Sequence, residues 1–118
     1  METTPQLLPT GALLAVKDTE FDYTESKQIG EIKMDQAFVL NKKQQESVLL
    51  FSEDSGIQMK VTTNQPSVVV YTPDTLDAIC FETQNYPDAP NYNHFPSSVL
   101  RPEEKYLNKS SFEFRIRK

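Results

Sequence analysis

The first side chain whose position could support chemistry is Glu82, in the middle of a strand predicted over residues 78–84. Side chains alternate along a strand, so Glu82 lies on one face together with Cys80 and Gln84. A carboxylate beside such neighbours is expected to be partly desolvated, which makes it a better proton acceptor near neutral pH. An exposed strand face fits the same residues, and composition alone does not decide between the two.

The loop that follows, residues 85–97, has the composition of a carbohydrate site. Three prolines stiffen it, and four Asn or Asp side chains can form hydrogen bonds with sugar hydroxyls. Its aromatic residues Tyr86, Tyr92 and Phe95 could stack on the face of a pyranose ring. Long loops in compact domains are usually functional, and a sugar site combines polar groups with aromatic faces. The loop therefore favours a sugar-binding function for the region around Glu82.

Metal and nucleotide chemistry are not indicated by the sequence. His94 is the only histidine, and in a loop rich in Pro and Asn we expect it to be structural or solvated rather than catalytic. One histidine and one cysteine cannot form a structural zinc site. Phosphate-binding loops, glycine-rich dinucleotide turns and serine-nucleophile motifs do not occur. We expect neither a metal nor a cofactor.

Asp35 is the second candidate carboxylate. It lies in the segment EIKMDQAFVL, residues 31–40, among apolar side chains that include Met34 and Phe38. Such a carboxylate is either a turn residue satisfied by the backbone or a contact for a ligand, and both interpretations stay open. A glycoside hydrolase that uses Asp35 and Glu82 as its carboxylate pair is one hypothesis, which requires a suitable carboxyl separation.

The elements that must position these side chains are short strands. No run reaches helix length, because Gly, Pro, Asn, Asp, Ser and Thr interrupt each one. An alternating pattern and a turn at residues 52–56 predict a hairpin, and a β-branched run predicts a strand covered on both faces. The predicted strands are 12–16, 47–51, 57–62, 68–71, 78–84 and 111–118, with a polar connection at 41–46 and a loop at 22–32. The sequence thus predicts an all-β, antiparallel β-sandwich.

Composition limits the domain number and the partners. A chain of 118 residues is enough for one domain, residues 1–118, and a mean hydropathy of −0.54 is low for an independent one. The net charge of −5 disfavours nucleic acid and anionic membranes. A single cysteine and no secretion signal predict a cytoplasmic location. The predicted strands have apolar faces that so polar a chain cannot cover by itself. We therefore expect a homo-oligomer or another partner that covers them.

Four segments resemble one known family when they are read together. The most specific is ETQNYPDAPNYNHFPSSVLRPEEKY, residues 82–106, and the others are LPTGALLAVKDTEFDY, IGEIKMDQAFVL and GIQMKVTTNQPSVVVYTPD. In this order they resemble the C-terminal part of the aldose 1-epimerases, also called galactose mutarotases. The resemblance implies a β-sandwich of which this chain is only the C-terminal portion.

The same resemblance implies the roles of individual residues. Glu82 occupies the position of the catalytic base and Asp35 that of a carboxylate that holds sugar hydroxyls, with Gln84 and Asn85 as further substrate contacts. The family interconverts the α and β anomers of hexoses such as galactose or glucose by proton transfer, without metal or cofactor. Its general acid is a histidine from an upstream part, and no matching motif occurs here.

The chain departs from the family pattern at two further places, Gln36 and the pair Glu103–Glu104. Without the acid, a non-catalytic carbohydrate-binding remnant remains an alternative to an isomerase. An upstream segment that completes the site is the alternative to a homo-oligomer.

Overall fold

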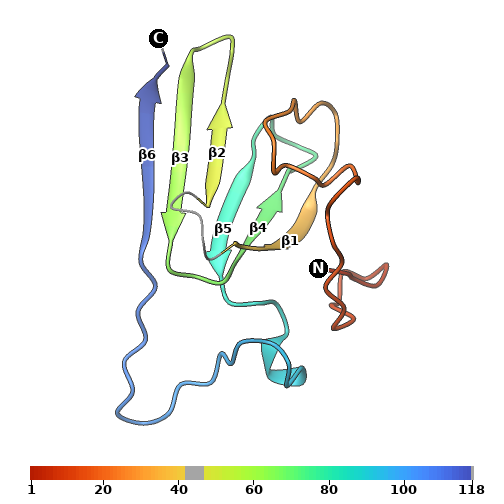
Figure 1. The fold of residues 1–118 in the computed structure, drawn as a ribbon, viewed down its shortest axis with the longest axis vertical. Coiled ribbons are helices and arrows are strands. Elements are labelled where there is room, and N and C mark those ends of the chain that lie inside the picture. The colour runs from red at the N-terminus through yellow and green to blue at the C-terminus, as the bar shows by residue number, and fades with distance from the viewer. Residues whose placement is uncertain (42–46, 118) are drawn as a thin grey trace.

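The computed structural model describes residues 1–41 and 47–117. Within them the elements are strands and one short 3₁₀ turn, without an α-helix (Figure 1). In chain order they are β1 (Asp35–Val39), β2 (Val48–Phe51), β3 (Ile57–Thr63), β4 (Ser67–Tyr71), β5 (Cys80–Gln84), η1 (Ala89–Asn91) and β6 (Ser110–Ile116). Every strand pair is antiparallel, so the predicted all-β, antiparallel fold class is confirmed. No helix in this described part is long and apolar enough to cross a membrane.

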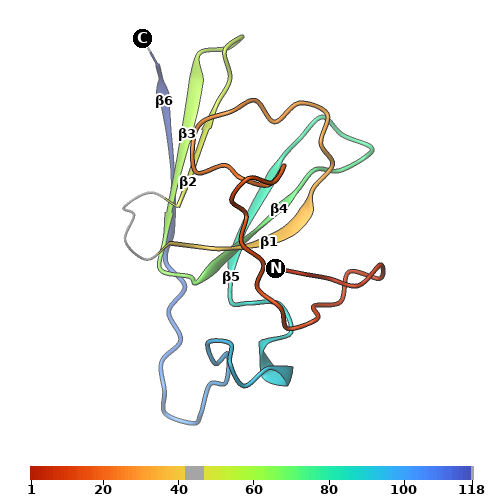
Figure 2. The same cartoon turned by 45° about the vertical axis from the view of Figure 1, so that its right-hand side comes forward.

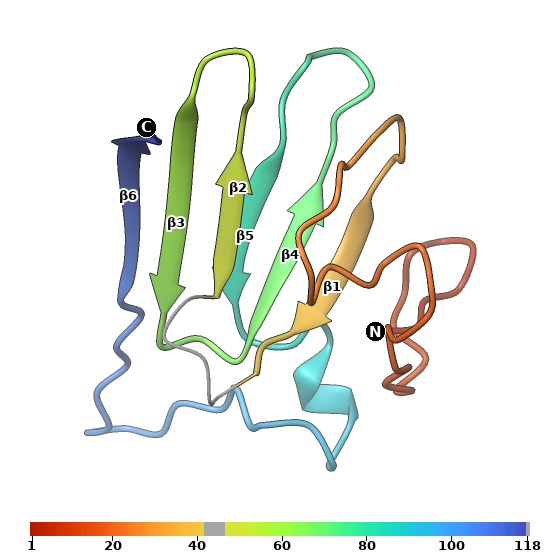
Figure 3. The same ribbon diagram turned by 45° about the horizontal axis from the view of Figure 1, so that its top comes forward.

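The strands form two sheets of three (Figures 1 and 3). One sheet has the order β1-β4-β5 and the other the order β2-β3-β6. The chain passes from β3 directly into β4 through residues 64–66, so this short connection joins one end of each sheet. The arrangement agrees with the predicted β-sandwich, and the predicted hairpin is the pair β2–β3.

The sheet β1-β4-β5 buries one of its faces. Met34, Val68 and Val70 form the core on this side. The segment before β1 covers them with apolar side chains, and Val48 of β2 packs against the same cluster, so both sheets contribute to it. The covering side chains of that segment are Tyr23, Ile29 and Ile32. Residues 22–32 are therefore irregular, as predicted, yet they supply part of the core.

Hydroxyl and amide side chains hold the ends of the two sheets together. The Ser110 hydroxyl lies 2.8 Å from the hydroxyls of both Thr63 and Thr83, which belong to different sheets. Asn64 donates through its side-chain nitrogen to the Leu107 carbonyl (2.9 Å) and accepts from the Lys109 backbone N–H (2.9 Å). Because these bonds fix the segment before β6, they also fix where β6 begins.

Gly56 and Glu103 are among the residues whose backbone lies in the left-handed region. Gly56 (φ 69°) closes the β2–β3 hairpin, where its N–H donates to the Ser52 carbonyl (2.9 Å). Glu103 has φ 70° in a turn in which the Glu104 N–H donates to the Arg101 carbonyl (3.1 Å). A residue with a side chain is strained in this region, where glycine is not. The departure at Glu103 therefore falls on a backbone position that favours glycine.

Most predicted strands are confirmed, with ends shifted by at most two residues. The predicted strand at residues 12–16 is wrong, because no strand of the described chain pairs with it, and Leu13 and Leu14 are exposed. Strand β1 is not predicted by the pattern, since its sequence DQAFV lacks strict alternation. Of the predicted connection at 41–46, residues 42–46 lie outside the described residues.

The core position Val68 tests the packing. Val68 is 2% exposed, whereas Val39 on the neighbouring strand is 43% exposed. Val68→Ala removes two buried methyl groups and leaves a cavity, so we expect the free energy of unfolding to fall by roughly 2 kcal/mol. Val39→Ala, the same chemical change on the surface, is expected to cost far less. Urea denaturation of both variants measures this, and equal losses would contradict the assigned core.

Candidate functional site

The second face of the sheet β1-β4-β5 carries both predicted carboxylates. Residues that pair directly across antiparallel strands point to the same side of a sheet. The pairing therefore defines a site face of three rows across β1, β4 and β5, which are Asp35–Tyr71–Cys80, Ala37–Val69–Glu82 and Val39–Ser67–Gln84. Asp35 and Glu82 lie on the outer strands in adjacent rows. Their Cα atoms are roughly 12 Å apart on the spacing of a regular sheet.

A shallow hollow of about 180 Å³ opens on this face. Asp35, Ala37 and Val69 form its floor, and Val69 is the direct cross-strand partner of Glu82. The walls come from the first residues of the chain and from the loop after β5, namely Met1, Thr3, Leu7, Pro9 and Pro87. Four segments far apart in the sequence thus meet at a hollow that Asp35 lines. The sequence does not predict that residues 1–9 contribute to this hollow, since they show no strand or helix pattern.

Glu82 and Asp35 are both exposed. Neither carboxylate has a hydrogen bond or an ion pair with any residue that the structure describes. The expected partial desolvation of Glu82 is therefore wrong for this chain, because its side chain stays exposed on the site face of β5. Of the two interpretations of Asp35, the turn residue is wrong, because Asp35 lies in strand β1 and lines the hollow. Its contact with a ligand stays a prediction.

The aromatic side chains of the loop have a different role from the one predicted. Tyr86 and Phe95 are buried against Ala89, with their ring centroids 5.1 Å apart. Burial also raises the pKa of Tyr86. Stacking of these two rings on a sugar is therefore wrong, because they form the small core that gives residues 85–97 their shape. The buried pair holds the backbone of the loop, including η1.

Tyr92 and His94 face the first residues of the chain. The Tyr92 hydroxyl donates to the Pro9 carbonyl (2.6 Å), so this ring too is engaged within the protein. The Nε2 atom of His94 lies 2.8 Å from the Gly11 carbonyl. A carbonyl oxygen only accepts, so His94 donates through Nε2. This contact agrees with the predicted structural role of His94.

Gln84 and Asn85 lie where β5 passes into the loop. Gln84 is in the row next to Glu82 on the site face, and its carbonyl accepts from the Ser67 hydroxyl (2.9 Å). The Gln84 side-chain nitrogen donates to the Asn85 carbonyl (3.3 Å). Both side chains are half-buried. Their expected contact with a substrate stays a prediction.

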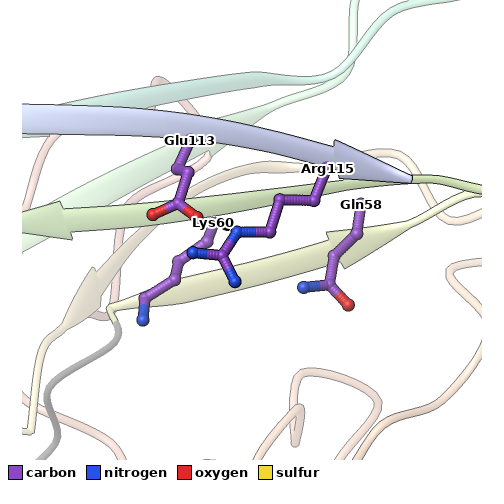
Figure 4. A pocket seen from close by; sticks show the side chains of 4 residues that line it. All are labelled: Gln58, Lys60, Glu113 and Arg115. Carbon is purple, nitrogen blue, oxygen red and sulfur yellow. Dashed lines mark ion pairs between the residues drawn. The ribbon is translucent and has the colours of Figure 1, made fainter. Parts of the chain in front are cut away.

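A second hollow, of about 90 Å³, lies on the other sheet (Figure 4). Gln58, Lys60, Glu113 and Arg115 line it, and Glu113 forms an ion pair with Arg115. These side chains project from β3 and β6, which belong to a different sheet from Glu82 and Asp35. No group of three His, Cys, Asp or Glu residues in 1–41 and 47–117 is placed to hold a metal ion.

Comparison with known proteins identifies the family. The family described as aldose 1-epimerase matches residues 1–113. Galactose mutarotase from Bos taurus is 31% identical and that from Homo sapiens 32% identical, and each alignment covers 93% of this chain and 39% of the relative. The chain thus spans about two fifths of the length of these curated relatives.

A solved structure gives the same result. The GalM/aldose epimerase homologue from C. elegans matches with a TM-score of 0.92 and 29% sequence identity, over 99% of this chain and 43% of that one. The two backbones therefore align over nearly every residue of this chain, although 29% of the residues are identical. This chain belongs to the aldose 1-epimerase family.

Proposed function

We propose that this chain supplies the base and part of the sugar-binding surface of an aldose 1-epimerase that acts on a hexose such as galactose or glucose. The observation that carries the proposal is the site face, where Asp35 lines a hollow and Glu82 pairs across the strands with Val69, another lining residue. Neither carboxylate has a hydrogen bond or ion pair among the described residues. Family membership supports it, since two of the relatives are named galactose mutarotase. Gln84 and Asn85 follow the base and are proposed as further substrate contacts.

The reaction consists of two proton transfers. The Glu82 carboxylate removes the proton from the anomeric hydroxyl while a general acid protonates the ring oxygen, and the bond from C1 to that oxygen breaks. The carbonyl carbon then rotates, the ring closes on its other face, and both protons return. Neither step changes an oxidation state, so no redox cofactor is needed.

The acid is proposed to come from polypeptide beyond these residues. His94 is the only histidine of the chain, and its Nε2 atom is engaged by the Gly11 carbonyl. A missing general acid removes a factor of roughly 10² to 10⁴ in rate. The 118 residues alone are therefore expected to bind a hexose and to accelerate mutarotation weakly or not at all.

The first prediction concerns Glu82→Gln in the intact protein that contains this chain. The amide keeps the shape of the side chain but cannot accept the proton, so mutarotation of fresh α-D-galactose, followed by polarimetry, is expected to fall by roughly 10² to 10⁴. Glu53→Gln is the control, because it removes the same charge from the exposed hairpin turn. A Glu82→Gln protein as fast as the control would rule out Glu82 as the base.

The second prediction concerns Asp35→Asn. Asp35 is proposed to hold sugar hydroxyls before and during the reaction. Its loss therefore weakens the binding of the substrate and of the transition state alike. We expect the KM for galactose to rise roughly tenfold or more while kcat changes less. Asp54→Asn in the hairpin turn is the control. A fall in kcat at constant KM would instead assign Asp35 to the chemical step.

Two other functions are separated by the same assays. A non-catalytic carbohydrate-binding domain would titrate with galactose but leave the mutarotation rate of the intact protein unchanged. A glycoside hydrolase with Asp35 and Glu82 as its pair would release reducing sugar from an aryl glycoside. The mutarotase proposal requires accelerated mutarotation and no such release.

An exposed apolar surface supports the proposal of a covering segment. Ile57 pairs with Ile116 across β3 and β6, and the same face of edge strand β6 carries Phe112 and Phe114. Phe114 is 65% and Ile116 69% exposed. We propose that the remaining part of the family's domain covers this face, since the relatives extend well beyond the matched 39%.

The third prediction tests this cover. The isolated 118 residues are expected to bind a hydrophobic dye and to self-associate in sedimentation experiments, because uncovered apolar faces do both. Phe114→Ser should weaken both effects, whereas Leu49→Ser on the opposite face of the same sheet should not. A monomer without dye binding would contradict the proposed cover. A stable homodimer of the intact protein across β6 would assign the face to a second copy instead.

The cytoplasmic location is likewise a proposal. It rests on the single cysteine of the chain, which is half-buried in β5.

A further inference from the structure

The first eleven residues form an arm that folds back on itself. Glu2 forms backbone hydrogen bonds with Thr10 (3.1 Å) and Ala12 (3.0 Å). The backbone nitrogen of Met1 donates to the Ala37 carbonyl (2.9 Å) at the outer edge of β1. The arm therefore reaches the sheet at β1, and its residues form most of the wall of the hollow.

The far end of this arm lies near the proline-rich loop that contains η1 (Figure 2). Two side chains of that loop fasten it there. The Tyr92 hydroxyl donates to the Pro9 carbonyl (2.6 Å), and His94 Nε2 donates to the Gly11 carbonyl (2.8 Å). Both rings also pack on Phe95, with centroid distances of 5.1 Å and 4.6 Å. The buried core of the loop thus holds both donors in place. We call Tyr92 and His94 the latch.

The Tyr92 ring lies against the backbone of Gly11, where any side chain would collide with it. A Cβ atom at this position would lie 2.6 Å and 2.7 Å from two carbon atoms of the Tyr92 ring, and the backbone has φ 88°. Gly30 has a similar positive φ of 65° but nothing within 4 Å of its would-be Cβ. Only at Gly11 does the missing side chain allow a ring to close on the backbone.

We propose that Tyr92 and His94 are positioning residues that set the shape of the hollow by fastening the arm to the loop. The loop contributes Pro87 to the lining of the hollow and the arm contributes Leu7 and Pro9, so the latch joins two segments that line it together with Asp35. Neither ring needs to touch the sugar, since both act through the backbone they hold. That the occupant of the hollow is a hexose rests on the function proposed above.

Amide hydrogen exchange tests the latch in the intact protein without any sugar. Tyr92→Phe keeps the ring and loses the bond to Pro9, so exchange at Glu2 and Thr10 is expected to accelerate roughly two- to tenfold. His94→Ala should act likewise, whereas His94→Gln places an amide N–H near Nε2 and should restore part of the protection. Exchange in β3 is expected to stay unchanged, which separates local opening from a general loss of stability.

Two matched controls accompany these variants. Gly11→Ala strains the backbone and displaces the Tyr92 ring, while Gly30→Ala strains the backbone alone, so only the first should release the arm. Tyr106→Phe removes a tyrosine hydroxyl that bonds Gln65 (3.3 Å) and should leave the arm protected.

The galactose assay then tests the consequence for the site. We expect Tyr92→Phe and Gly11→Ala to raise the KM several-fold with kcat nearly unchanged, because the wall is displaced and the reacting carboxylate is not. Unchanged exchange of the arm in every variant would overturn the latch, and a released arm with unchanged KM would overturn its positioning role. The unmodified protein could neither bind nor convert galactose while the latch variants still accelerate amide exchange in the arm. That result would overturn the proposed function and support the latch.

Discussion

The pairing of β4 with β1 on one side and β5 on the other is the constraint on which the site depends. Its register, Ala37 to Val69 to Glu82, brings two carboxylates from segments 47 residues apart to the same face of one sheet. Side chains alternate along a strand, so a slip of one residue in β5 would turn Glu82 to the opposite face. The Ser67 hydroxyl, bonded to the Gln84 carbonyl, adds a contact that favours this register.

The two faces of that sheet are used differently. One face is packed under the segment before β1 and β2, with Val68 and Val70 at its centre. The other has a floor of small and β-branched side chains, Ala37 and Val69, and receives its walls from loops. A packed core on one face and loop-built walls on the other is a common arrangement for ligand sites, because the scaffold fixes the position of functional groups while the loops shape the space.

The proline-rich loop shows how pattern and packing can suggest different roles for the same residues. Its Tyr and Phe side chains match the composition of a sugar site, but Tyr86 and Phe95 are buried and Tyr92 is bonded to the arm. Sequence alone could not decide between these two roles. An aromatic ring makes the same kind of apolar contact when it packs inside a loop as when it stacks on a sugar. The wall formed by residues 1–9 was likewise beyond prediction, because the contacts that place it join residues more than 80 positions apart.

The sequence by itself determined five of the six described strands, the antiparallel pairing and the family, and it singled out the two candidate carboxylates, because these depend on local alternation and on specific motifs. It also indicated the hairpin at residues 52–56 and the structural nature of His94. Only the tertiary structure decided that Glu82 is exposed, that β1 is a strand and that the arm meets the loop beside Asp35. Burial and long-range contacts depend on which segments cover each other in space, and residue order does not specify that.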